Sequence, residues 1–238
     1  MRLLSFDTTS PALNLCLYDG SVVATERLEP TSAPRQEAAA MLVPAIDKLT
    51  AGAGWRKDEL SALCVNTGPG SFTGIRTGLV TARTLAHALG LPLLGVSRFE
   101  CFASAVPRPV GIILFCGPGL YFAAAYKDRS EGSFTPILEP AYVPAADISE
   151  TLSSTGRWLA EPRALAELSE KKDTSWPSVS LERLPELGNI AVEQAQIAWD
   201  RLSFTVPGCP DPEKLAGEFH WMQVEPLYLR GPSVTKKR

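Results

Sequence analysis

The fold is decided by the stretch GPGSFTGIRTG, which occupies Gly68–Gly78. It follows an apolar run, Ala62–Asn66, with the length of a buried strand, and it opens an apolar-striped helix that extends to about Leu89. Glycine allows backbone conformations that other residues avoid, and the proline between the first two glycines stiffens the turn. The hydroxyl of Ser71 or Thr73 is placed to cap the first free amides of the helix. The stretch therefore predicts a strand, a glycine loop and a helix in succession.

A glycine loop at the start of a helix can either bind an anion or serve only as a turn and helix cap. Its free amides and the helix dipole point the same way, which favours an anion such as phosphate. The alternative is a tight turn and a helix cap without a ligand. A phosphate loop of the Walker type ends in Lys-Ser or Lys-Thr, whereas this loop ends in Thr73-Gly74. The Walker type is therefore excluded, and the two roles stay open.

The helix after the loop has one face made of very small residues. They recur every four positions, as Gly74, Gly78, Ala82, Ala86 and Gly90. A groove of this kind lets another element approach closely, and it needs a packing reason because glycine destabilises a helix by up to ~1 kcal/mol relative to alanine. Two occupants are open: the chain's own sheet, or a helix of another subunit across an interface.

The composition is that of a chain with enough hydrophobic residues to form a buried core. Its 238 residues fit one large or two small domains, and 45% of them are hydrophobic. The formal net charge of −3 argues against a protein that coats nucleic acid by bulk electrostatics. The five cysteines have no CxxC spacing, and several lie in apolar runs, which predicts reduced thiols. The apolar runs are too short to cross a membrane, and the chain opens directly on a strand without a signal peptide, so we expect a soluble, cytoplasmic protein.

The first hundred residues alternate between predicted strands and helices. A hairpin is expected at 13–26 with Asp19-Gly20 as its turn, and a helix at 37–49 that Pro44 is expected to bend. Further strands are predicted at 3–6, 62–66 and 92–96. A three-stranded antiparallel meander followed by helix, strand, helix and strand indicates one α/β layer with a mixed sheet.

A domain boundary is predicted near Pro107-Arg108-Pro109, with an N-terminal lobe at 1–106 and a C-terminal lobe at 107–238. The second lobe opens with apolar runs at 111–115 and 121–126, and helices are expected at about 163–171 and 188–202. Much of the rest is predicted to be proline-rich loop. The final segment is a candidate to pack back on the first lobe.

Residues suited to catalysis are few. The two histidines, His87 and His220, have no cysteine or carboxylate at metal-ligand spacing, so no zinc or iron site is expected. Asp7 follows the first strand and has two interpretations. It either orients Mg²⁺ or a water in a nucleotide site, or it forms a turn with Thr8 and Ser10.

At this point the residues resemble a known family, TsaB (also called YeaZ), bacterial members of the actin/sugar-kinase/Hsp70 superfamily. The resemblance covers Met1 to about Ala105 most clearly, and residues 127–185 match only in length and texture. It rests above all on Gly68–Gly78, with further agreement at Leu4–Thr9, Leu42–Pro44, Leu94–Ser97 and Pro226–Arg230.

The resemblance implies an α/β fold of two ribonuclease-H-type lobes, each with a mixed β-sheet and helices. Members of the family are partner subunits of the related catalytic protein TsaD. With the small ATPase TsaE they make N6-threonylcarbamoyladenosine beside the anticodon of tRNAs that read codons starting with A. The threonylcarbamoyl donor is an adenylate made by a separate enzyme, and family members also form homodimers.

The resemblance also implies which residues carry the role. The family's contacts with the catalytic subunit use the two first-lobe helices, here about 36–50 and 71–89. The expected partner interface is Leu42, Ile46, Gly74, Ile75, Arg76, Gly78, Leu79, Ala82 and Ala86. A degenerate nucleotide site would consist of Asp7, Thr8, Thr9, Gly68 and Gly70. We expect no catalytic or metal-binding residue and no tightly bound cofactor in this chain, whereas the complex uses ATP and Mg²⁺.

Three departures from the family pattern favour a non-catalytic scaffold. Ala38-Ala39-Ala40 stands where members often carry a histidine, Phe115-Cys116-Gly117 where many have Asp-Ala-Arg, and Thr77 where an aliphatic residue is more usual. The alternative function is an independent nucleotide-dependent kinase or hydrolase that uses Asp7 and Gly68–Gly74.

The end of the chain is its most basic stretch. Arg230, Lys236, Lys237 and Arg238 lie close together, and the tail is either a tRNA contact or a solvated end.

Overall fold

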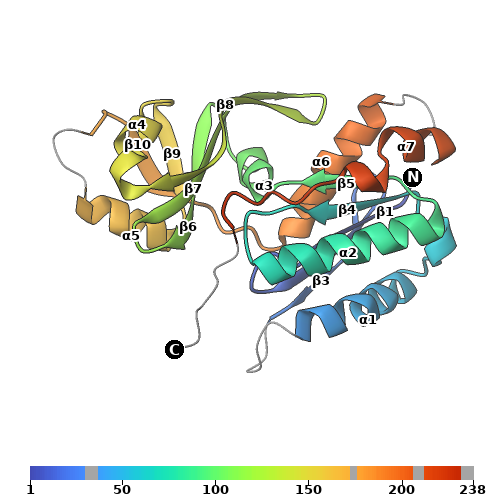
Figure 1. The fold of residues 1–238 in the computed structure, drawn as a ribbon. Helices are drawn as coiled ribbons and strands as arrows, with labels where there is room; N and C mark the ends of the chain where they lie inside the picture. The colour runs from blue at the N-terminus through green and yellow to red at the C-terminus, as the bar shows by residue number, and fades with distance from the viewer. Residues whose placement is uncertain (30–36, 172–175, 206–211, 232–238) are drawn as a thin grey trace. The chain divides into compact units, whose positions relative to one another are not determined.

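The computed structural model describes residues 1–29, 37–171, 176–205 and 212–231 (Figure 1). Contacts divide the chain into two compact units. The first consists of Met1–Cys101, Glu131–Ser133 and Leu187–Leu227, and the second of Phe102–Ser130, Phe134–Glu186 and Tyr228–Arg238. The boundary expected at residues 106 and 107 thus lies inside the second unit, and the long segment after Leu187 contributes to the first.

The first unit is built on a five-stranded mixed sheet. Its strands are β1 (Leu3–Asp7), β2 (Leu13–Tyr18), β3 (Val22–Leu28), β4 (Ala62–Asn66) and β5 (Leu93–Val96), in the order β3-β2-β1-β4-β5. β1, β2 and β3 pair antiparallel, and β4 and β5 are added parallel to β1. The predicted meander and mixed sheet are therefore confirmed.

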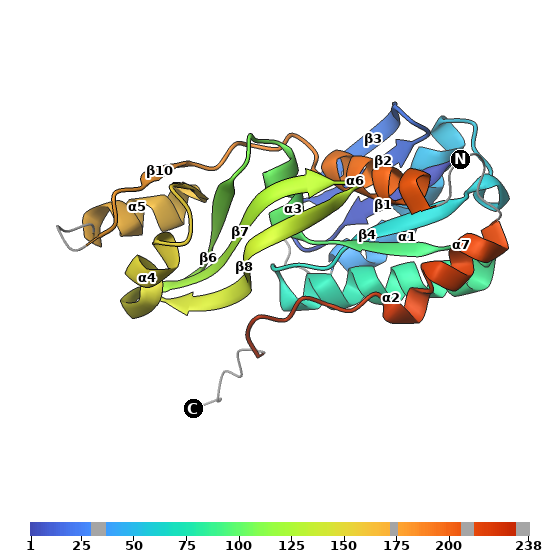
Figure 2. The same cartoon turned by 90° about the horizontal axis from the view of Figure 1, so that it is seen from above.

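Helices cover both faces of this sheet. α1 (Glu37–Gly52) and α2 (Phe72–Leu89) lie beside each other on one face, as Figure 1 shows. α6 (Ile190–Thr205) contacts β1, β2 and β4 and crosses over the strands in the view from above (Figure 2). Successive side chains of a strand point to opposite faces of the sheet. In β4, Val65 joins the core under α1 and α2, whereas the preceding Cys64 faces α6 and its Sγ donates to the Gln194 carbonyl at 3.7 Å.

The segment after α7 (Pro212–Glu218) closes the β5 side of the sheet. The Leu93 amide donates to the Phe219 carbonyl at 3.0 Å, and the Leu227 amide donates to the Thr67 carbonyl at 2.8 Å. Arg83 of α2 donates to the Val224 carbonyl at 2.6 Å. The chain thus packs back on the first unit as far as Leu227.

The second unit contains another five-stranded sheet. Its strands are β6 (Val110–Gly117), β7 (Leu120–Ser130), β8 (Ser133–Pro144), β9 (Arg157–Ala160) and β10 (Ser180–Arg183), in the order β10-β9-β6-β7-β8. α4 (Ile148–Leu152) and α5 (Pro162–Lys171) contribute to its core, in which Trp158 is fully buried. The helix expected at about 163–171 is confirmed as α5, whereas the expectation of proline-rich loop for much of the remainder was wrong, since β8, α4, β9 and β10 lie there.

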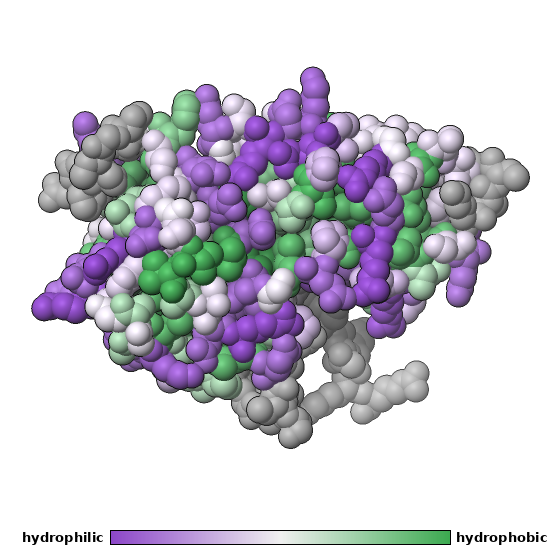
Figure 3. Space-filling view, turned by 180° about the vertical axis from the view of Figure 1, so that it is seen from behind, coloured by the Kyte–Doolittle hydropathy of each residue, from purple (hydrophilic) through white to green (hydrophobic). Residues whose placement is uncertain are grey.

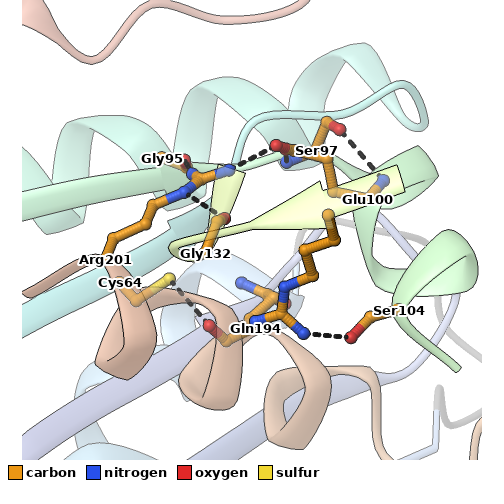
Figure 4. Close-up of polar contacts among 9 residues, drawn as sticks. Cys64, Gly95, Ser97, Glu100, Ser104, Gly132, Gln194 and Arg201 are labelled. Atoms are coloured by element: carbon orange, nitrogen blue, oxygen red, sulfur yellow. Dashed lines mark hydrogen bonds and ion pairs between the residues drawn. The ribbon is translucent and has the colours of Figure 1, made fainter. Parts of the chain in front are cut away.

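A polar cluster ties α6 to neighbouring loops of the first unit (Figure 4). Arg201 forms an ion pair with Glu100 of α3 (Arg98–Ser104), and its guanidinium donates to the Gly132 carbonyl at 2.9 Å and the Gly95 carbonyl at 3.1 Å. Both side chains of the ion pair are less than one fifth exposed. Glu100 also accepts from the Ser97 amide at 2.7 Å, so the cluster is fully connected.

Removing the cation from this cluster is expected to destabilise the fold. We predict that Arg201→Met lowers the free energy of unfolding by about 2–4 kcal/mol, because it leaves a largely buried carboxylate and two carbonyls without their donor. Urea titration followed by circular dichroism measures this loss. The Glu100→Gln, Arg201→Met pair should lose less than the sum of the single variants. A loss below about 1 kcal/mol for Arg201→Met would show that solvent replaces the ion pair.

The described cysteines are all free thiols. Cys16, Cys64 and Cys101 are buried, and burial raises the pKa of Cys16 and Cys64 to about 12. This agrees with the prediction of reduced thiols for the described positions, and Cys209 lies outside the described residues. Among the described residues, no helix has both the length and the apolar character needed to cross a bilayer.

Candidate functional site

The glycine loop joins β4 to α2 through hydrogen bonds within the chain. Ser71 caps α2, and its hydroxyl accepts from the Gly74 amide at 3.2 Å. The Gly68 amide donates to Asn66 Oδ1 at 2.8 Å, and the Ser71 amide donates to the Thr9 carbonyl at 3.0 Å. Three amides that a phosphate would need therefore already have partners. The observed hydrogen bonds favour a tight turn and a helix cap over a phosphate loop.

Glycine is required in α2 because the turn after β1 lies directly against it. A Cβ on Gly74 would lie 2.0 Å from the Thr8 carbonyl oxygen, and one on Gly78 would lie 2.4 Å from Thr8 Oγ1. Thr8 Oγ1 also donates to the Gly74 carbonyl at 2.7 Å. A Cβ on Gly70 would lie 2.6 Å from the Thr9 carbonyl oxygen. These contacts lock the helix onto the turn at residues 8 and 9.

Asp7 is buried at the end of β1 and holds that turn. Its Oδ1 accepts from the Thr9 amide at 2.8 Å and from Thr9 Oγ1 at 2.7 Å. Its Oδ2 is buried and has no hydrogen-bond partner among the described residues.

The residues of the expected nucleotide site, Asp7, Thr8, Thr9, Gly68 and Gly70, thus meet at one junction. A bound nucleotide with Mg²⁺ fits them poorly. Its phosphates would compete with Asn66, Thr9 and Ser71 for the loop amides, and Asp7 Oδ2 alone is a single oxygen ligand. We therefore derive no chemical step through a nucleotide at this junction.

The small-residue groove is filled by the chain's own sheet. Gly78 faces Thr8 and Val65, and Ala82 and Ala86 are fully buried in the first unit's core. Of the residues expected at a partner interface, the following are buried: Leu42, Ile46, Gly74, Ile75, Gly78, Leu79, Ala82 and Ala86. Their assignment as contact residues has to be corrected, because a partner cannot reach them without unpacking the core. Only Arg76 of that set is exposed.

The outer face of α1 and α2 carries exposed apolar side chains. Val80 of α2 is 63% exposed, and Val43 and Met41 of α1 are 45% and 37% exposed. Arg76 lies on the same side of α2 as Val80, one turn earlier, with its guanidinium 4.3 Å from the ring centre of Phe72. The outer face is defined here as the exposed side chains Met41, Val43, Arg76 and Val80; Met41 and Val43 are two positions apart, so they lie on opposite flanks of α1. Sequence reasoning missed the three apolar members. Val80 could have been found, because it lies two positions from both Gly78 and Ala82 and therefore on the side of α2 opposite the groove.

Exposed apolar side chains also occur elsewhere among the described residues, for example Met222, Phe204 and Val22. Figure 3 shows the molecule from behind, where hydrophobic side chains form small groups among hydrophilic ones. Among the described parts of the chain, no group of three or more His, Cys, Asp or Glu side chains is arranged to hold a metal ion.

Comparisons with known proteins agree with the motifs. A family model described as TsaD, tRNA N6-adenosine threonylcarbamoyltransferase, matches residues 28–135. The chain is 34% identical over 112 residues to the tRNA threonylcarbamoyladenosine biosynthesis protein TsaB of Escherichia coli, covering 47% of this chain and 46% of that protein. It is 31% identical over 104 residues to the protein of the same name from Bacillus subtilis, with 44% of each chain covered. The chain thus spans about half the length of the curated relatives that it matches.

The fold is shared over nearly the whole chain. YeaZ from Pseudomonas aeruginosa superimposes with a TM-score of 0.69 at 21% identity, covering 96% of this chain and 99% of that one. The expected α/β fold with two mixed sheets is therefore confirmed, and it is the fold of YeaZ. The curated relatives and the shared fold agree with the resemblance seen in the motifs: over about half of its length this chain is similar to proteins named TsaB, and it shares the fold of YeaZ.

Proposed function

We propose that the chain is the non-catalytic dimerisation and activating subunit of a complex that modifies tRNA. The complex attaches a threonylcarbamoyl group to N6 of the adenosine beside the anticodon, in tRNAs that read codons starting with A. The observation that carries this proposal is the match to proteins named TsaB, which are described as tRNA threonylcarbamoyladenosine biosynthesis proteins. The partners would be a TsaD-type catalytic subunit, a TsaE-type ATPase and, through the complex, tRNA.

The outer face of α1 and α2 is the surface we propose for the catalytic subunit. It combines exposed apolar side chains with an arginine, and aromatic, apolar and arginine side chains dominate the centres of protein interfaces. The contact of α2 with the turn at residues 8 and 9 supports the role of this face in binding a partner. Because α2 is locked onto the turn at residues 8 and 9, Arg76 and Val80 are held in fixed positions and lose little conformational freedom on binding.

In this proposal the chemistry belongs to the catalytic subunit. Asp7 and the glycine loop would then have a structural task, which is to hold α2 on the sheet. ATP and Mg²⁺ are used by the complex and are not held tightly by this chain. The same outer face would serve a homodimer when the catalytic subunit is absent.

Two measurements test the proposal. Untagged catalytic subunit should co-purify with the tagged chain from its native host at near-equal amounts. The isolated chain should show no ATP turnover above background, and Asp7→Ala should leave that background unchanged. Steady ATP turnover by the isolated protein that Asp7→Ala abolishes would instead support an independent nucleotide-dependent enzyme.

A further inference from the structure

The second unit carries two stacks of arginine on an aromatic ring at one end of its sheet. The Arg163 guanidinium lies 4.2 Å from the ring centre of Phe115, at the end of β6. The Arg230 guanidinium lies 5.8 Å from the ring centre of Tyr142 on β8, and its Nη1 lies 3.8 Å from Cys116 Sγ. Phe115 and Cys116 are consecutive in β6, at a register irregularity beside the turn into β7. The two stacks therefore flank the β6–β7 turn.

A third cation lies over the same turn. A Cβ on Gly119 would lie 3.6 Å from Lys171 Nζ, which places this ammonium group beside the backbone of the turn. We define the turn cluster as Arg163, Lys171 and Arg230.

The carboxylates beside the turn cluster are engaged with the turn's backbone. Glu161 accepts from the Phe115 amide at 2.7 Å, and Glu167 accepts from the Gly119 amide at 3.0 Å and from the Tyr121 hydroxyl at 3.2 Å. The Gly119 hydrogen bond is the largest cause of the lowered pKa of Glu167. Three cations thus stand against two carboxylates that are bound to amides. This is a local positive excess in a chain whose formal net charge is −3.

The geometry of the stacks suits RNA. A guanidinium over an aromatic ring keeps N–H groups at its edge for phosphate, and its outer side can stack on a base. Single-stranded RNA is recognised by this combination of stacking planes and positive charge. The Phe122 ring, 6.2 Å from that of Tyr142, adds further aromatic surface near the second stack.

We propose that the turn cluster and its aromatic rings form a contact surface for single-stranded RNA, and that the occupant is the anticodon loop of tRNA. The inference rests on the proposed function for the identity of the RNA. It extends that function, because it assigns this chain a direct contact with the substrate in addition to its contact with the catalytic subunit. The basic residues after Gly231 lie outside the described residues and are not needed for it.

The test compares RNA binding by the wild type and an Arg163→Gln, Arg230→Gln double variant. The probe is a fluorescently labelled anticodon stem-loop RNA, titrated at two salt concentrations with the reconstituted complex and with the isolated chain. We expect about 10-fold or greater loss of affinity and a shallower salt dependence for the double variant, since each lost phosphate contact lowers the slope by roughly 0.7. Arg163→Lys should recover only part of the loss, because lysine keeps the charge but not the planar guanidinium.

The matched control is Arg183→Gln, which removes an exposed arginine of the same unit that is paired with Glu186. It should leave RNA affinity unchanged, and thermal melts should show that all variants fold. Equal affinity and salt slope for wild type and double variant, with either preparation, would overturn the inference. So would an equal loss in Arg183→Gln, or a loss of catalytic-subunit binding with RNA binding intact. Failure of the proposed function would show separately, as failure of the wild-type chain to bind the catalytic subunit.

Discussion

Val80→Glu is expected to weaken binding of the chain to a TsaD-type catalytic subunit by about 30-fold or more while leaving the fold intact. Val80 is 63% exposed, so a charged side chain there stays hydrated in the free subunit. In the complex the carboxylate would lose its hydration and replace an apolar contact, with Arg76 one turn earlier as its nearest cation, and a loss of this kind at the centre of an interface costs about 2 kcal/mol. Isothermal titration calorimetry with the purified catalytic subunit measures the effect.

The control is Val22→Glu, the same change at a valine of β3 that is 48% exposed in the same unit. It should leave the affinity within about twofold of wild type, because β3 lies outside the proposed surface. If both variants bind as tightly as wild type, the outer face of α1 and α2 is not the contact. If both lose affinity equally, the effect is not specific to that face.

Gly74→Ala is expected to destabilise the protein by about 3 kcal/mol. Helix propensity alone predicts the opposite sign, since alanine stabilises a helix interior by up to ~1 kcal/mol relative to glycine. The new Cβ would lie 2.0 Å from the Thr8 carbonyl oxygen, a backbone atom that cannot move aside without shifting the turn after β1. Urea titration gives the free energy of unfolding of both proteins.

Gly52→Ala is the matched control, because a Cβ at Gly52, at the end of α1, meets no atom within 4 Å. It should be neutral or slightly stabilising. A Gly74→Ala protein as stable as wild type would mean that the helix and the turn are not locked together, and the fixed presentation of Arg76 and Val80 would lose its structural basis.

Sequence reasoning predicted the first unit well because its signals are local. The glycine loop, the hairpin turn at Asp19-Gly20 and the alternating strands each specify their own conformation, whereas the pairing of β4 with β1 was given only by the structure. The strands at 133–144, 157–160 and 180–183 were missed for physical reasons. β8 contains Pro136 and Pro140, and most of its side chains are at least partly exposed, so it lacks an apolar pattern.

The candidate site shows a different limit of sequence reasoning. The small residues of α2 correctly indicated a close contact, but periodicity cannot say whether the occupant is the chain's own sheet or a partner's helix. Thr8 is the occupant, and it lies 66 residues away from Gly74 along the chain. The three-dimensional contacts were therefore needed to show that the groove is occupied and that the exposed residues are those of the outer face, Val80 among them. The arginine–aromatic stacks of the second unit were also invisible, because each joins residues from different elements.

The role as a partner subunit is tested most directly by formation of threonylcarbamoyladenosine on tRNA in a reaction rebuilt from purified components. The reaction contains the catalytic subunit and the ATPase of the same organism, the threonylcarbamoyl adenylate donor and tRNA. Product should accumulate with the wild-type chain, fall to background when the chain is left out, and stay near background with Val80→Glu. Product formed at the same rate without the chain, or at the full rate with Val80→Glu, would contradict the proposed role and its surface, respectively.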